Sequence, residues 1–163
     1  MQAAIGYIQL GMSEEANDEL EELPPELRAS DEVLALRIEI YQRLAKWESA
    51  RVLAESLAKR SPENYGWWLS WSDALRREQS VEAAQAVLRK GWEIHPDVPQ
   101  IAYNLACYAS VLGDLAESRT LLKIAFDMEP GLRMTALDDP DLDPIFGHGL
   151  QSATRPIPEA DPS

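Results

Sequence analysis

The stretch AYNLACYASVLGDLAESRTLLKIAFDMEP, residues 102–130, decides the fold. Its apolar residues recur at helical spacing on both sides of a break at residues 112–114, which predicts two amphipathic helices. Gly113 favours the left-handed backbone that ends a helix, and Asp114 followed by Glu117 is typical of a capping box that begins the next one. Pro130 cannot continue a helix and ends the pair. The stretch therefore predicts a helical hairpin.

The hairpin recurs along the chain. Three prolines that would each end a pair, Pro62, Pro96 and Pro130, are 34 residues apart. A series of small residues has the same spacing, and so does a series at the turn: Ala16, Ala50, Ala84 and Ser118, and Gly11, Ala45, Gln79 and Gly113. Several series in one phase indicate an internal repeat. We expect the small residues, Ala84 among them, where two helices approach closely.

This pattern resembles the tetratricopeptide repeat, a family whose unit is a 34-residue helix-turn-helix. The matching residues in the last three units are Leu34, Tyr41, Leu44, Ala50 and Pro62; Trp68, Ala84, Leu88 and Pro96; and Tyr103, Asn104, Leu105, Ala106, Gly113 and Pro130. The first unit is weaker, because Arg28 stands where a proline would close it. The resemblance covers about residues 1–130 and implies an all-α, right-handed α-solenoid of about four repeats.

Eight helices are expected, near residues 1–10, 13–22, 30–44, 47–60, 64–78, 81–94, 98–112 and 115–128. Asp97 and Gln100 are interpreted as the capping box of the seventh. After Pro130 we expect a short helix at 132–137 and a turn that begins at Asp139 and Pro140, which together cap the open end of the last pair. The sequence thus predicts one repeat domain with its cap at 1–146 and a flexible tail at 147–163.

Composition limits the choice of partners. The chain has 163 residues and a formal net charge of -13, with 45% hydrophobic residues. Such an acidic surface disfavours nucleic acid and anionic membranes as partners. Cys107 is the only cysteine, so no internal disulfide can form. The first residues make a poor signal peptide, and no apolar run reaches the length of a membrane span. We expect a cytoplasmic protein with a protein or peptide partner.

Chemistry-bearing motifs are weak in this sequence. His95 and His148 lack partners at the spacing of zinc ligands. A calcium loop that began at Asp139 would need glycine at Pro144 and glutamate at Leu150. The sequence has no glycine-rich phosphate loop and no nucleophile elbow. We therefore expect no enzyme activity, no cofactor and no metal.

A concave groove is the remaining candidate site, because the first helix of each pair lines it in the family that the pattern resembles. The positions carried over to this chain are Ala35, Glu39, Arg43, Leu69, Asp73, Arg76, Arg77, Tyr103, Asn104 and Cys107. Some family members grip a terminal carboxylate with cations, which the matching positions here lack. Arg43, Arg76 and Arg77 are interpreted either as a basic edge or as members of helical ion pairs, Glu39–Arg43 and Asp73–Arg77.

Tyr103 and Leu105 lie on different faces of the expected helix. The carried-over register predicts Tyr103 exposed in the groove as an anchor for a partner, and Leu105 buried in the core. A module that binds a peptide or a partner helix in this groove is the favoured function. The alternative is a structural subunit or homo-oligomer that assembles through its convex or end surfaces.

Overall fold

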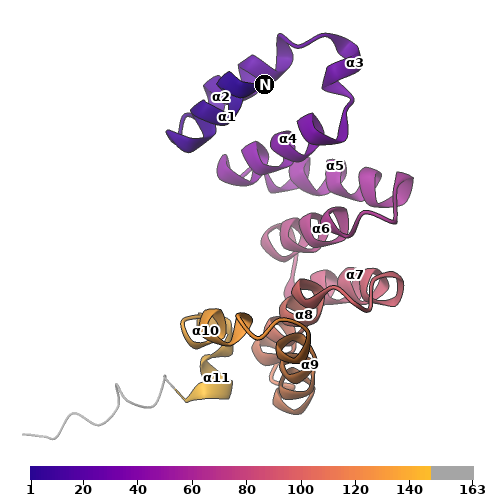
Figure 1. Cartoon of the computed structure of the whole chain (residues 1–163), viewed down its shortest axis with the longest axis vertical. Helices are drawn as coiled ribbons and strands as arrows, with labels where there is room; N and C mark the ends of the chain where they lie inside the picture. Colours follow the sequence, from indigo (N-terminus) through magenta and orange to yellow (C-terminus); the bar gives the residue numbers. More distant parts are fainter. Residues whose placement is uncertain (148–163) are drawn as a thin grey trace, which may run out of the picture.

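A computed structural model describes residues 1–147, in which every regular element is a helix. The helices are α1 Gln2–Gln9, α2 Ser13–Glu21, α3 Pro25–Arg28, α4 Asp31–Arg43, α5 Trp47–Arg60, α6 Tyr65–Glu78, α7 Val81–Ile94, α8 Pro99–Val111, α9 Leu115–Met128, α10 Leu132–Leu137, the 3-10 turn η1 Pro140–Leu142 and α11 Asp143–Phe146. Helices α4 to α9 stack in chain order along one long axis, and α10 and α11 lie beside α8 and α9 (Figure 1). The predicted all-α solenoid is confirmed.

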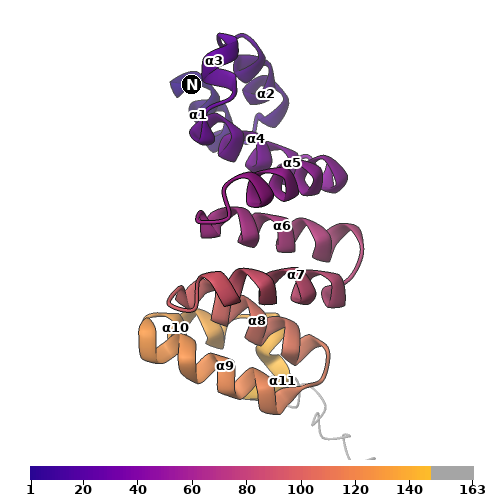
Figure 2. The same cartoon turned by 90° about the vertical axis from the view of Figure 1, so that its right-hand side faces the viewer.

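Helix bounds follow the local signals closely. The expected ranges 47–60, 81–94 and 115–128 coincide with α5, α7 and α9, and 132–137 coincides with α10. Figure 2 shows α5, α6 and α7 as successive layers of this stack. The short helix α3 was not predicted. Pro24 is its N-cap and Pro25 its first residue, and proline in the first helical turn starts a helix as readily as it ends one.

Caps and turns explain where the helices start and stop. Asp114 accepts a hydrogen bond from the Glu117 backbone N–H at 3.0 Å, as the capping box predicts. Gly11 and Gly113 have φ of 76° and 85°, and Ala45 adopts a left-handed φ of 54° at the corresponding turn. The predicted cap at Asp97 is wrong. Val98 is the N-cap of α8, and Pro99 takes the first helical position.

The core forms where small residues let helices approach. Ala16, Ala50, Ala84 and Ser118 are fully buried, which confirms the predicted role of that series. In the third pair, Gly91 lies so close to Trp68 that an added Cβ would sit 2.9 Å from the Trp68 Cβ. Trp67 and Trp68 are buried, while Trp71 is half-buried against the same core. The tryptophans of α6 therefore pack in the interior.

The last turns of the chain cover the end of the stack. Elements α10 and α11 pack on α9, and η1 packs on α8. Leu142 in η1 is fully buried, and Ile145 and Phe146 pack against the core from α11. The predicted flexible tail falls outside the described residues, except Gly147. Within residues 1–147, no helix combines the length and the apolar character that crossing a bilayer requires.

Candidate functional site

Three inner helices carry the predicted groove residues at matching positions. The 34-residue spacing relates Ala35, Glu39 and Arg43 on α4 to Leu69, Asp73 and Arg77 on α6, and to Tyr103, Cys107 and Val111 on α8. Residues four apart share one face of a helix, so each set forms a stripe. A hydrogen bond from the Gln42 amide to the Asp73 carboxylate, at 3.1 Å, ties α4 to α6.

The stripe on α4 is open to solvent. Ala35 is exposed, and the side chains of Glu39 and Arg43 are 44% and 47% exposed. Arg43 donates to Glu39 at 2.8 Å, which confirms the predicted helical ion pair. Six of the positions that the sequence predicts to line a groove, Ala35, Glu39, Arg43, Leu69, Asp73 and Arg77, are called the open groove.

Arg77 has a different partner from the one predicted. The expected Asp73–Arg77 pair is not among the ion pairs of residues 1–147, and the Arg77 guanidinium lies 5.7 Å from the centre of the Trp47 ring instead. Asp73 lies deeper, and burial raises its pKa above the ordinary value although Arg77 and Arg76 act in the opposite direction. The open groove therefore presents two acidic and two basic side chains beyond Leu69, with no net basic edge.

The stripe on α8 is covered at Tyr103 and Cys107 by the chain's own C-terminal turns, whereas Val111 is 45% exposed. Tyr103 donates its hydroxyl proton to the Asp139 carboxylate at 2.7 Å, and the Cys107 thiol lies 3.6 Å from the same oxygen. Arg76 of α6 donates twice to Asp141, at 2.5 Å and 2.7 Å. We call residues 139–146 the docked segment. The positions that this segment covers are called the closed groove.

Burial in the closed groove corrects the predicted exposure of Tyr103. Tyr103 is 7% exposed and Cys107 4%, because the docked segment lies over both, while Asn104 is half-buried beside them. The prediction that Leu105 is buried is confirmed, at 1% exposed. Asp139 and Asp141 are the residues that sequence reasoning missed as groove contacts. Asp139 was expected only as a cap, and it does accept a bond from the Asp141 backbone N–H at 3.0 Å.

The docked segment changes the acidity of the groups beneath it. Burial, with the Asp139 hydrogen bond second, raises the pKa of Tyr103 well above its ordinary value. Burial and the Asp139 charge raise the pKa of the Cys107 thiol in the same way. The ion pair with Asp141 raises the pKa of Arg76. At neutral pH the closed groove therefore holds a protonated thiol, a neutral phenol and a paired guanidinium.

Cys107, Asp139 and Asp141 bring three ligand-type atoms within 4.8 Å of one another. Asp141 is already neutralised by Arg76, and Asp139 accepts from Tyr103. The geometry therefore fits a hydrogen-bond network that holds the docked segment better than it fits a metal centre.

Comparisons with known proteins agree with this architecture. The solved structure "MamA RS-1 ArsTM double mutant" is 15% identical, covers 94% of each chain and has a TM-score of 0.64. The solved structure "MamA MSR-1 C2" is 17% identical, with a TM-score of 0.62, and the match covers 78% of this chain and 73% of that one. Both are helical solenoids of the tetratricopeptide-repeat type. No family model matches the sequence, and neither does any curated protein. The likeness is one of fold.

Proposed function

We propose that the protein is a non-enzymatic interaction module whose open groove receives a peptide or helix from a protein partner. The observation that carries the proposal is the docked segment, which occupies the equivalent positions one unit further along. It contributes two carboxylates, Asp139 and Asp141, and one fully buried apolar side chain, Leu142. A short segment with this chemistry thus already binds the inner face of the solenoid in cis.

The open groove has the same kinds of contact to offer. Leu69 is a half-buried apolar position level with Ala35 at one end of the open groove, and Glu39, Asp73, Arg43 and Arg77 follow along the two helices. A preformed surface of this kind binds without paying for its own ordering, which favours affinity. We propose a partner segment with one apolar anchor near Leu69 followed by charges of both signs. The protonated, buried Cys107 is in keeping with a reducing compartment, and we propose a cytoplasmic location.

Matched substitutions of two exposed alanines test the groove. Ala35 lies in the open groove, and Ala86 lies on the outer helix α7. An arginine at either site should leave folding unchanged, since both side chains are exposed. Quantitative pull-down from native lysate should show that Ala35→Arg loses the partners that wild type and Ala86→Arg retain. Equal recovery by all three proteins would contradict binding in the open groove.

A structural role is the second candidate, and exposed apolar side chains at the first helical pair favour it. Met1, Ile5, Leu10 and Met12 are 49%, 39%, 74% and 37% exposed. Apolar side chains gathered at one end of a solenoid are typical of an assembly surface. Sedimentation over a range of concentrations separates the two proposals. A mass that rises with concentration, and that Leu10→Glu returns to that of one chain, would favour assembly through this end.

A further inference from the structure

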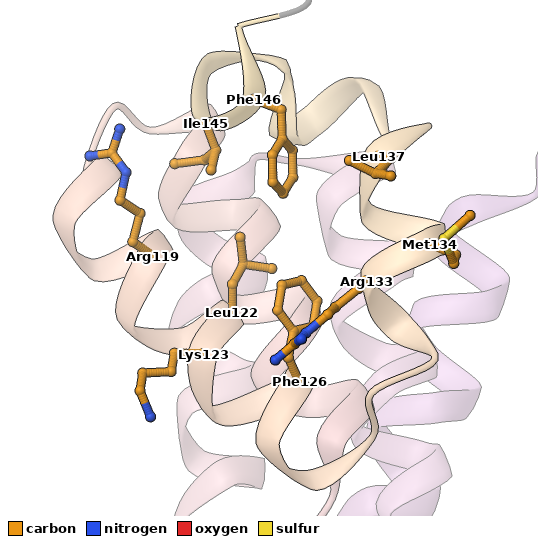
Figure 3. Close-up of a pocket in the computed structure, with 9 residues that line it drawn as sticks. All are labelled: Arg119, Leu122, Lys123, Phe126, Arg133, Met134, Leu137, Ile145 and Phe146. Atoms are coloured by element: carbon orange, nitrogen blue, oxygen red, sulfur yellow. The ribbon is translucent and has the colours of Figure 1, made fainter.

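A hollow of about 500 Å³ lies on the far side of α9 from the solenoid interior, between α9, α10 and α11 (Figure 3). Its apolar lining consists of Leu122, Phe126, Met134, Leu137, Ile145 and Phe146. Met134 is 71% exposed and Leu137 45%, so water covers apolar surface here in the free protein. This surface shares Ile145 and Phe146 with the docked segment but contains none of the residues of the open groove, and the inference drawn from it does not depend on the proposed function.

The helix lengths explain why the hollow exists. The inner helices α4, α6 and α8 have 13, 14 and 13 residues, and α10, which follows α9 as the next inner helix would, has only 6. Six residues span about 9 Å, against about 20 Å for the longer helices. The chain then turns back through η1 to α11. The face of α9 is thus covered at its two sides by short elements and left unfilled between them.

Three cations line the same hollow, and no carboxylate does. Arg119 and Lys123 lie along one edge, with Met134 and Leu137 on the opposite side, and Arg133 lies over the Phe126 ring at 5.6 Å (Figure 3). Lys123 pairs with Asp127, at 2.7 Å, on the exposed surface of α9. Among residues 1–147, Arg119 and Arg133 form no ion pair, although ten such pairs involve most of the other cations.

The arrangement is locally unfavourable in the free protein. Arg119 and Lys123 are four residues apart on one helix, where like charges repel. The chain as a whole has a net charge of -13, so this is a positive site on an acidic molecule. A ligand with carboxylates beside an apolar face would relieve the repulsion and cover the exposed Met134 and Leu137 at once.

We propose that this hollow binds an amphipathic helix of a partner protein, with apolar side chains on its buried face and glutamates or aspartates along its edges. The helix takes the place that a longer α10 would have filled against α9. Its apolar side chains enter between Phe126 and Phe146. Its carboxylates reach Arg119 and Lys123 on one side and Arg133 on the other, and these charged contacts at the rim set specificity and association rate.

The test uses the full chain and a labelled synthetic peptide of about 16 residues, long enough to hold a helix. Leucine and phenylalanine occupy positions i, i+3, i+4 and i+7, and the edges carry glutamates. A second peptide has lysines in their place. Fluorescence anisotropy should show binding of the glutamate peptide that weakens with salt, and much weaker binding of the lysine peptide. Equal binding of both peptides would overturn the proposal.

Three variants locate the binding site. The double variant Arg119→Gln/Arg133→Gln should lower the affinity for the glutamate peptide by roughly tenfold. Met134→Asp, at an exposed position, should lower that affinity as strongly. The control Lys90→Gln removes a charge from an exposed position on α7 and should change the affinity little. If Ala35→Arg lost binding and the variants of the hollow kept it, the peptide would lie in the open groove and the proposal would be overturned. A concentration-dependent mass of the free protein that Met134→Asp abolishes would also overturn it, because a second copy would then occupy the hollow.

Discussion

Helices α4 and α8 hold the same place in their respective pairs and are both 13 residues long, yet they differ greatly in burial. Nine residues of α8 are buried, against three of α4. Part of the difference arises on the inner face, where the docked segment covers Tyr103 and Cys107 of α8 and nothing in residues 1–147 covers the matching Ala35 and Glu39 of α4. One architecture thus contains a groove position that the chain fills itself and another that it leaves open.

The comparison shows how a solenoid ends. A repeat buries its faces against its neighbours, and the last repeat lacks one neighbour. Here the chain covers α8 with η1, and it covers the face of α9 in part, with α10 and α11. The polar part of the closure comes from Asp139 and Asp141, so the closed groove is held by directional contacts as well as by apolar burial.

The largest effect is expected at Leu142, the fully buried anchor of the docked segment. Leu142→Ala should lower the free energy of unfolding by about 2–5 kcal/mol, since it removes buried methyl groups and leaves a cavity. The control is Leu137→Ala on α10, where 45% exposure predicts a change within about 0.5 kcal/mol. Urea denaturation of the three proteins measures both values. Equal midpoints for the two variants would mean that the segment is not docked.

Ion pairs provide the second comparison. Arg76 and Asp141 are 26% and 21% exposed and bond in two places, whereas Arg43 and Glu39 are 47% and 44% exposed. A double-mutant cycle with Arg76→Gln and Asp141→Asn should give a coupling energy of about 1–3 kcal/mol. The same cycle with Arg43→Gln and Glu39→Gln should give about 0.3–0.5 kcal/mol. A larger coupling energy for the Arg43–Glu39 pair than for the Arg76–Asp141 pair would contradict the closure of the groove at Asp141.

Alkaline pH should act on the closed groove. The raised pKa of Cys107 means that the unfolded chain loses the thiol proton first, at a pKa of about 8.5, while the folded chain keeps it. Above that pH the unfolded state binds fewer protons, so the free energy of unfolding falls as pH rises, by up to about 1.4 kcal/mol per pH unit. Melts of wild type and Cys107→Ala between pH 7 and about 10 should diverge in slope. Parallel slopes would show that the thiol is not buried.

The smallest effect is expected at the turns. Ala45 has a left-handed φ of 54° where the corresponding turn of the last pair has Gly113, with φ 85°. Ala45→Gly removes the steric cost of that conformation, partly offset by a freer unfolded chain, so stability should rise by up to about 1 kcal/mol. Gly113→Ala should lower stability by about 1 kcal/mol for the same reason. Thermal melts of the two variants measure both changes in stability. A stabilising Gly113→Ala would contradict the left-handed backbone at this turn.

The helices could be predicted from the sequence because their signals are local. Pro99 and Asp114 start helices, Gly11 and Gly113 end them, and the buried small residues recur with the period of the repeat. These features act within a few residues of themselves. The error at Asp97 has the same local origin, because Val98 and Pro99 began the helix one residue later than the capping box required.

The closed groove could not be predicted, because it depends on contacts between distant parts of the chain. Arg76 and Asp141 are 65 residues apart, and Tyr103 and Asp139 are 36 apart. The register of the family that the sequence resembles predicts Tyr103 in the groove but carries no information on what covers that position. Asp139 was rightly expected as a cap, since its second oxygen accepts from Asp141, but nothing in its neighbourhood pointed to Tyr103. The cation-lined hollow depends likewise on how α10 and α11 pack on α9.

The most direct measurement is the rate at which a thiol reagent labels Cys107, the only cysteine in the chain. The docked segment covers this thiol and keeps it protonated, so labelling requires the segment to open. We expect the native protein to react at least roughly a hundredfold more slowly than the protein in urea. Arg76→Gln should accelerate the reaction, and Glu39→Gln in the open groove should not. Labelling of the native protein as fast as that of the unfolded chain would contradict the docked segment, and with it the division of the groove into closed and open parts.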